Sequence, residues 1–332
     1  MPSFLQFLND ERVIITEGAV IERLRRKSAM MLNPHVLNSS LIYNPAEKIQ
    51  LEIIYRQYID CACWYDLPVI ILTPTWRANP ERISLAGLKN RDLNADCYRF
   101  LNKIRLSYDR YAGRIAIGGL MGSAGDAYKP ADALPAEKAC SFHSAQVREL
   151  VSAGVDFLLG STLPAYSEAL GMAQTMAESG CPYVLSFVVR PSGRLLDDTL
   201  LSDAIRNIDD AVSSPPAGYM VNCVHPENFR KAMTDHDYIS AGVLRSGTRP
   251  EGRGQDLDLL KKRIIGLQAN TSRRSPEELD GCEKLDSEEP ETFGEMMVSL
   301  HEDFSLKILG GCCGTDEKHI DAIVRLLTLY CK

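Results

Sequence analysis

Short apolar runs alternate with helix-like segments along the whole chain of 332 residues, and this alternation constrains the fold more than any other feature. Continuous apolar runs are typical of parallel strands that are covered by helices on both faces. The predicted strands lie at residues 13–16, 68–73, 114–117, 155–159, 183–189, 219–222, 263–268 and 306–309. The main predicted helices lie at 22–31, 47–63, 94–111, 137–153, 166–179, 200–212, 226–233 and 316–329. Eight strand candidates separated by helices favour a (β/α)8 TIM barrel, formed by a single domain over residues 1–332, rather than an open doubly wound sheet.

The composition is that of an ordinary globular protein, with 45% hydrophobic and 24% charged residues. A net charge of -7 argues against partners such as nucleic acid or an anionic membrane surface. No apolar stretch reaches the roughly 20 residues needed to span a bilayer, and residues 1–11 do not resemble a signal peptide. The 10 cysteines are scattered rather than arranged as a disulfide framework. We therefore expect a reduced, cytoplasmic environment.

Cysteines stand at the ends of two predicted strands. The sequence Gly-Gly-Cys-Cys-Gly occupies residues 310–314, and Cys223 follows the run at 219–222. Since the loops after the strands of such a barrel share one face, we expect Cys223, Cys312 and Cys313 to converge there. Three thiols without a fixed fourth ligand are typical of a zinc site that keeps one position open. Asp316 is predicted to cap the helix that follows.

Two other interpretations of the cysteines stay open at this stage. The double-cysteine segment is also compatible with a tight turn that buries its thiols. A closed structural zinc site would need a fourth ligand, and His225 is the candidate because it lies two residues after Cys223. Two loops also stand out. Residues 122–135 are rich in Gly, Ala, Pro and Asp and long enough to suggest a role at a site, whereas residues 245–258 indicate a mobile insertion.

Several segments together resemble the homocysteine S-methyltransferase family over nearly the whole chain. The most specific are Val-Asn-Cys at 221–223 and the Gly-Gly-Cys-Cys-Gly segment followed by His319. Thr-Glu-Gly-Ala at 16–19 is similar to the acidic turn after the family's first strand. The resemblance implies Zn²⁺ held by Cys223, Cys312 and Cys313, and methyl transfer from a small donor to the thiol of homocysteine, giving methionine. It implies no catalytic residue beyond the metal site, and it implies substrate contacts at Glu17, Gly18, Thr75, Ser161 and Asn222.

The chain departs from the family pattern where substrate would be recognised. Ser161 stands where the family commonly has a glutamate that holds the substrate amine, so Glu17 is the candidate replacement. Trp76 stands where some members have a tyrosine that can approach the metal, and an indole cannot ligate it. Pro74 replaces an asparagine, and residues 269–272 depart from the usual Tyr-Pro-Asn pattern. These changes leave two alternatives open: a relative that binds or methylates a different thiol or selenol, and a non-catalytic zinc-holding barrel.

The expected chemistry depends on charge. Three cysteine thiolates and a substrate thiolate give a zinc centre a net double negative charge, which keeps the substrate sulfur nucleophilic. A donor with a positive sulfonium or quaternary ammonium centre would be attracted to that site. The chain has no additional length for a cobalamin or folate domain, so S-methylmethionine, betaine or S-adenosylmethionine is the expected donor. A folate or corrinoid protein acting in trans is the alternative.

Overall fold

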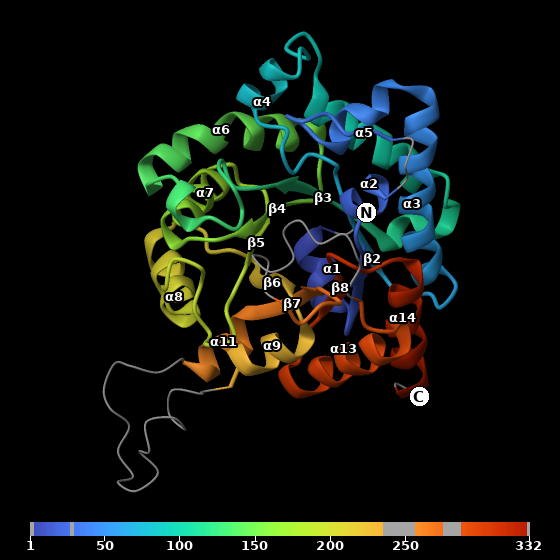
Figure 1. The fold of residues 1–332 in the computed structure, drawn as a ribbon, viewed down its shortest axis with the longest axis vertical. Coiled ribbons are helices and arrows are strands. Elements are labelled where there is room, and N and C mark those ends of the chain that lie inside the picture. The colour runs from blue at the N-terminus through green and yellow to red at the C-terminus, as the bar shows by residue number, and fades with distance from the viewer. Residues whose placement is uncertain (1–2, 27–29, 235–255, 275–286, 331–332) are drawn as a thin grey trace, which may run out of the picture.

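A computed structural model describes residues 3–26, 30–234, 256–274 and 287–330. Its parallel strands pair in sequence order, and β8 pairs with β1 to close the barrel (Figure 1). The strands are β1 (Ile14–Thr16), β2 (Val69–Leu72), β3 (Ile115–Met121), β4 (Phe157–Leu163), β5 (Tyr183–Phe187), β6 (Gly218–Val224), β7 (Ile264–Ala269) and β8 (Ile308–Gly311). All eight predicted strands are present, and the predicted (β/α)8 barrel is confirmed.

Helices surround the barrel and cover the outer faces of its strands (Figure 1). The α-helices are α1 (Phe4–Asp10), α2 (Ile21–Arg25), α3 (Pro45–Cys63), α4 (Pro80–Leu85), α5 (Leu93–Leu106), α6 (Ala136–Ala153), α7 (Tyr166–Glu178), α8 (Leu201–Ala211), α9 (Pro226–Ala232), α11 (Leu257–Arg263), α13 (Pro290–Phe304) and α14 (Glu317–Tyr330). Three short 3-10 helices lie at η1 (Asn38–Tyr43), η2 (Asp109–Arg114) and η3 (Pro130–Asp132). None of the helices among the described residues has the length and apolarity to cross a membrane.

The N-terminal helix α1 closes one end of the barrel. Phe4 stacks on Phe157 from the start of β4, with ring centroids 3.9 Å apart. Phe7 and Leu8 are buried in the same apolar cluster inside the barrel. Lys307, just before β8, donates to the backbone oxygen of Leu8 at 2.9 Å, which ties α1 to the amino end of that strand. The pocket described below therefore opens at the opposite end, where the strands finish.

Some element boundaries differ from the prediction because glycines continue strands that they were expected to end. β3 runs through Gly118 to Met121, because these residues pair with β4. Position 118 has room only for glycine, since a Cβ there would meet the Phe157 ring at 2.6 Å. β8 likewise includes Gly310 and Gly311. The first predicted helix ends early, at Arg25, with only Leu24 buried and no side-chain cap. The helix expected to reach residue 111 ends at Leu106, after which η2 begins with the positive φ of Asp109.

Among the described residues, four α-helices were not predicted: α1, α4, α11 and α13. Each has a local signal, for example the Ser3–Gln6 capping box before α1 and the Asp256 side chain that caps α11. Residues 245–255 of the expected insertion lie outside the described residues. The predicted cap of α14 is present, because Asp316 accepts from the backbone N–H of Lys318 at 3.0 Å.

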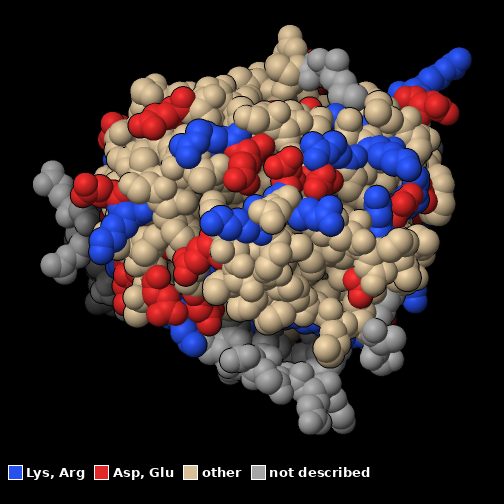
Figure 2. Space-filling view, turned by 90° about the horizontal axis from the view of Figure 1, so that it is seen from above, with Lys and Arg blue, Asp and Glu red and all other residues tan. Residues whose placement is uncertain are grey.

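Acidic and basic side chains are interspersed over the face of the molecule shown in Figure 2. Ion pairs among the described residues include Arg56 with Glu52 at 2.8 Å and Arg206 with Asp256 at 2.9 Å. Exposed pairs of this kind contribute about 0–1 kcal/mol each. Because acidic and basic side chains are mixed on the face in Figure 2, that face carries no extended patch of a single charge.

Candidate metal centre

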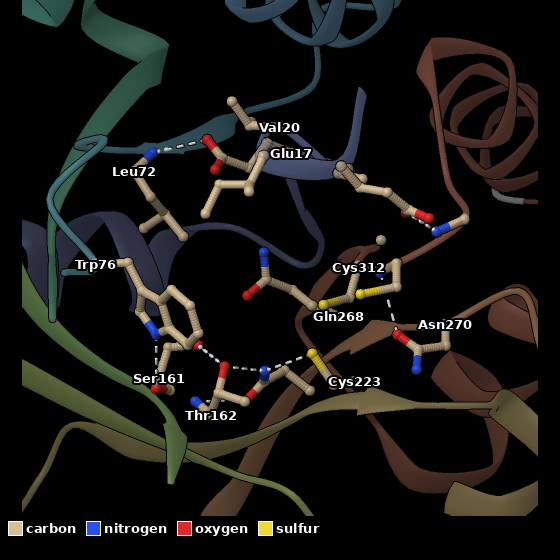
Figure 3. Close-up of a pocket in the computed structure, with 18 of the residues that line it drawn as sticks. Glu17, Val20, Leu72, Trp76, Ser161, Thr162, Cys223, Gln268, Asn270 and Cys312 are labelled. Carbon is tan, nitrogen blue, oxygen red and sulfur yellow. Dashed lines mark hydrogen bonds between the residues drawn. The ribbon is translucent and has the colours of Figure 1, made fainter. Parts of the chain in front are cut away.

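The ends of β6 and β8 bring three thiols together. Cys223 is the last but one residue of β6, and Cys312 and Cys313 follow β8 directly. The sulfur atoms of the three side chains all lie within 4.8 Å of one another. They face a pocket of about 770 Å³ at the carboxyl end of the barrel, as Figure 3 shows for Cys223 and Cys312. The predicted convergence is therefore present in the structure.

Backbone hydrogen bonds hold the double-cysteine segment in place. The N–H of Cys312 donates to the carbonyl of Ala269 at 2.7 Å, and the N–H of Cys313 donates to Oδ1 of Asn270 at 3.1 Å. The hydroxyl of Thr315 donates to the carbonyl of Cys312 at 2.7 Å. The end of β7 and the turn before α14 thus fix both cysteines without using their side chains.

The glycines of the segment are required by close packing. A Cβ at Gly310 would lie 2.7 Å from the backbone oxygen of Thr16. Gly314 adopts φ +86°, and a Cβ there would lie 1.8 Å from Oγ1 of Thr271. The two thiols therefore sit on a backbone path that larger residues could not follow.

Cys223 is placed by a strained strand end. Cys223 and Thr162 both have positive φ, 56° and 61°, and the ladders of β6 and β4 shift register at these points. For a β-branched residue such as threonine this conformation is a genuine outlier, costing about 1–3 kcal/mol. A strain of this size persists only where surrounding contacts enforce it.

Asn222 supplies those contacts. Its Oδ1 accepts from the N–H of Thr162 at 3.1 Å and from the hydroxyl of Ser186 at 2.7 Å. Its Nδ2 donates to Oγ1 of Thr162 at 2.8 Å and to Sγ of Cys223 at 3.2 Å. Asn222 lines the pocket, and its role in binding substrate stays a prediction, since all of these hydrogen bonds serve the strand ends and the sulfur.

The thiols share charge unequally. Hydrogen bonds from Cys312 and Cys313 hold the pKa of the Cys223 thiol well below its usual range. The hydrogen bond to Cys223 raises the pKa of Cys312 well above the ordinary value, and it also raises the pKa of Cys313, to about 12. One thiolate therefore accepts from two thiols, and a soft divalent cation would displace the remaining protons. Three convergent sulfurs on an accessible pocket fit a zinc ion with an open position.

The two nearby histidines have other partners. His225 accepts from the N–H of Glu227 through Nδ1 at 3.2 Å, and its Nε2 lies 3.7 Å from the carboxylate of Glu288. His319 bonds to Asp316 at 2.7 Å and to the backbone oxygen of Glu288 at 3.1 Å. His225, the candidate for a closed fourth position, does not belong to the metal-capable cluster found among the described residues.

Further residues that line the pocket come from the turn after β1, from β4 and from β7, which lies between the two strands that carry the cysteines. Oε2 of Glu17 accepts from the N–H of Leu72 at 2.8 Å, and burial raises the pKa of this carboxyl to about 8. Gly18 and Ser161 line the same pocket, and their contacts with substrate stay predictions. In Figure 3 the amide of Gln268 points into the space between Glu17 and Thr162. The sequence analysis did not single out Gln268, although it noted the altered pattern beginning at the next residue.

Thr75 differs from the other predicted substrate residues because it does not line the pocket. It is fully buried, and its hydroxyl donates to the backbone oxygen of Leu120 at 2.7 Å. Its neighbours Thr73 and Trp76 form that part of the wall instead. The indole N–H of Trp76 donates to the backbone oxygen of Ser161 at 3.2 Å, away from the sulfurs.

A tyrosine from a different loop lines the same pocket as the thiols. It is Tyr128, in the loop between β3 and α6. Burial beside the three cysteines raises the pKa of Tyr128 well above its usual range. The length of the 122–135 loop predicted a role at a site, but no pattern in the loop singled out this residue.

This barrel, with a three-thiol cluster and an open pocket at the carboxyl ends of its strands, defines a class of enzyme that acts on a small molecule at a thiolate metal site. The sequence profile of the homocysteine S-methyltransferase family matches residues 14–327, and the chain belongs to that family. The prediction of a methyltransferase of this family is thereby confirmed.

Similar proteins agree with this assignment. Homocysteine S-methyltransferase of Escherichia coli (strain K12) is 24% identical over 241 residues, which cover 68% of this chain and 74% of that protein. The metallated form of the homocysteine methyltransferase MmuM from Escherichia coli superimposes with a TM-score of 0.72 at 18% identity, covering 96% of this chain and 98% of that one. The oxidized form of MmuM superimposes with a TM-score of 0.69 at 20% identity, and the match covers 96% of this chain and 97% of that one. At these identities the structural likeness establishes the shared fold.

Proposed function

We propose that this protein transfers a methyl group from a small, positively charged donor to the thiol of homocysteine, giving methionine, at a zinc ion bound by Cys223, Cys312 and Cys313. The observation that carries the proposal is the convergence of these three sulfurs within 4.8 Å at the wall of a substrate-sized pocket. Family membership supports the reaction class, and the metallated form of MmuM supports a metal in a barrel of this kind.

The reaction is a displacement at carbon. A bound zinc ion would supply the Lewis acidity that keeps the acceptor thiol deprotonated at neutral pH. The acceptor sulfur forms a bond to the methyl carbon, and the bond from that carbon to the donor's sulfur or nitrogen breaks. The electron pair of the broken bond stays on the donor, which leaves as a neutral thioether or amine. The negative charge of the cysteines favours the cationic donor.

The chain's own residues hold the acceptor in place. Glu17 is the buried carboxyl on the pocket wall that can pair with the amine of homocysteine. Because the pKa of Glu17 is raised to about 8 in the free protein, pairing with an ammonium group requires the carboxyl to lose its proton. Ser161 and Gln268 contribute neutral hydrogen-bonding groups to the lining of the same pocket.

The neutral residues that line the pocket support a second candidate function. Ser161 gives an ammonium group no counter-charge, and Gln268 adds a neutral amide. These groups also suit an acceptor thiol or selenol that carries an uncharged polar group in place of the amine. We infer a cytoplasmic location in either case, because the free thiols of the cluster persist in a reducing compartment.

Metal analysis and calorimetric titration test the proposal. The protein, purified under reducing conditions with zinc, is expected to retain one equivalent of zinc, and homocysteine is expected to bind with release of protons. A bound metal with no heat from homocysteine, but heat from another thiol in a small panel, would favour the second candidate. Failure to retain zinc would contradict the metal site and leave a non-catalytic barrel.

A further inference from the structure

We infer that Arg25, the last residue of α2, is a substrate-binding residue that pairs with a carboxylate of the acceptor or of the donor. The inference rests on the proposed function, because it names a charged group that the substrates of that reaction carry. It adds a contact at the opening of the pocket, where Arg25 is exposed and lines the cavity. Neither the metal centre nor the proposed amine contact at Glu17 uses this residue.

Charge pairing leaves one cation of the pocket without a partner among the described residues. The Asp, Glu, Lys and Arg side chains in the described part of the pocket lining are those of Glu17, Glu22, Arg25, Arg26, Asp126 and Lys129. Arg26 forms an ion pair with Glu22, and Nζ of Lys129 lies 3.5 Å from the carboxylate of Asp126. The guanidinium of Arg25 has no ion pair or hydrogen bond with the residues that the structure describes. An anionic group of a bound molecule can therefore pair with it without displacing a contact of this part of the protein.

The helix that carries Arg25 is held against the double-cysteine segment. The carboxylate of Glu22 accepts from the N–H of Gly314, the last residue of that segment. Nη2 of Arg23 lies 2.6 Å from Oε2 of Glu317, at the start of α14. Because these two contacts tie α2 to the turn and the helix that follow the cysteines, Arg25 projects from a backbone that is fixed relative to the metal ligands.

The turn before α2 is tied to the same part of the chain. The N–H of Gly311 donates to the carbonyl of Glu17 at 3.1 Å, and the N–H of Ala19 donates to Oγ1 of Thr315 at 3.0 Å. Glu17 and Arg25 therefore lie at the two ends of one stretch that is fixed to the cysteine segment at several points. This stretch presents a buried carboxyl and an exposed guanidinium to one pocket. Together these two groups complement the ammonium and the carboxylate of an amino acid.

The side chain of Arg25 suits a carboxylate, because the planar N–H groups of a guanidinium form two parallel hydrogen bonds with the two carboxylate oxygens. Homocysteine carries one carboxylate, and so does each of the expected donors, S-methylmethionine, betaine and S-adenosylmethionine. The carboxylate is therefore the group assigned to Arg25, whichever of the two substrates supplies it. Pairing with Arg25 selects amino-acid substrates over simple thiols and sulfonium ions that lack this group.

Calorimetric titration of the zinc-loaded protein tests the acceptor. Homocysteine and 3-aminopropane-1-thiol differ only by the carboxylate, so the ratio of their dissociation constants measures what that group contributes. We expect Arg25→Met to reduce this ratio about fivefold, which is the upper range for an exposed ion pair. Lys129→Met is the matched control, because it removes a cation of the same pocket that already pairs with Asp126. The control should keep the wild-type ratio, and an equal loss in both variants would overturn the inference in favour of a general charge effect.

The same titration with S-methylmethionine, betaine, S-adenosylmethionine and the decarboxylated counterpart of each tests the donor. A reduced ratio for homocysteine assigns the carboxylate to the acceptor, and a reduced ratio for one of the donors assigns it to that donor. Arg25→Lys should restore part of the lost ratio, because it returns the charge without the planar fork. Unchanged ratios in Arg25→Met for homocysteine and for every donor overturn the inference, while homocysteine binding itself leaves the proposed function intact. A zinc-loaded protein that binds neither homocysteine nor any of the donors contradicts the proposed function, and the inference falls with it.

Discussion

The two walls of the pocket are built on different principles. On the sulfur wall, backbone hydrogen bonds, two glycines without room for a side chain and a strained strand end fix the cysteines. On the acceptor wall, Glu17, Ser161 and Gln268 project side chains from strand ends into the cavity. The metal chemistry is thus fixed by the backbone, whereas recognition depends on side chains that can be exchanged without rebuilding the fold. This difference explains why the cysteine motif matches the family while the acceptor wall departs from it.

The largest effect is expected from the removal of one of the three sulfurs. Cys312→Ala leaves two thiols. We expect its metal affinity to fall by more than ~100-fold, which is the upper loss for substitutions of residues that support a metal ligand. Methyl transfer should disappear with the metal. Cys140→Ala, which removes a thiol on α6 outside the pocket, is the control. Zinc content by elemental analysis is the measurement, and full occupancy in Cys312→Ala would show that the cluster is not the metal site.

A smaller change on the sulfur wall removes the support of Cys223. Asn222→Ala leaves the N–H of Thr162 and the hydroxyl of Ser186 without their shared acceptor. We expect metal affinity to fall ~10–100-fold, as for other residues that orient a ligand, and the protein to unfold at a lower temperature. Competition with a zinc chelator measures the affinity. Wild-type affinity would mean that the strained strand ends hold Cys223 unaided.

On the acceptor wall, Glu17→Gln removes the carboxyl that would pair with the substrate amine. Losing one partner of a buried charge pair costs about 2 kcal/mol or more, so KM for homocysteine should rise ~30-fold with little change in kcat. In the wild type the carboxyl is protonated below its pKa of about 8, so affinity should fall as pH drops below that value and level off above it. The variant should lose this dependence. If the affinity of Glu17→Gln still depends on pH in this way, the pH dependence belongs to another group.

Ser161→Glu is expected to have the smallest effect. It adds a second carboxylate to the lining of the pocket that Glu17 also lines. If homocysteine is the acceptor, its affinity should rise on the order of tenfold, equivalent to about 1.4 kcal/mol. Titration calorimetry with homocysteine, and with an amine-free thiol for comparison, gives the answer. An equal response to both thiols would favour the second candidate function.

The barrel and its cysteines could be predicted because their signals are local. Each strand is a continuous apolar run, and Cys312 and Cys313 lie in a segment whose glycines mark a tight backbone path. Their meeting with Cys223 follows from the shared face of strand ends. Strand lengths were less predictable, because whether Gly118 ends a strand depends on the Phe157 ring packed against it.

The remaining site residues depend on contacts distant in sequence. Tyr128 sits in a loop without periodicity, and its position is set by Glu168, 40 residues further along the chain. Thr75 is buried and does not line the pocket, whereas Thr73 and Trp76 do. A turn of one residue decides which side chains face the pocket, and the sequence does not show that turn. The raised pKa of Glu17 is likewise a consequence of burial that no local pattern encodes.

X-ray absorption at the zinc edge tests the central claim most directly, because it counts the sulfur atoms around the metal. We predict three sulfur neighbours in the protein as purified with zinc, and four after homocysteine is added. A first shell without sulfur, or one in which homocysteine adds no sulfur, would contradict the account.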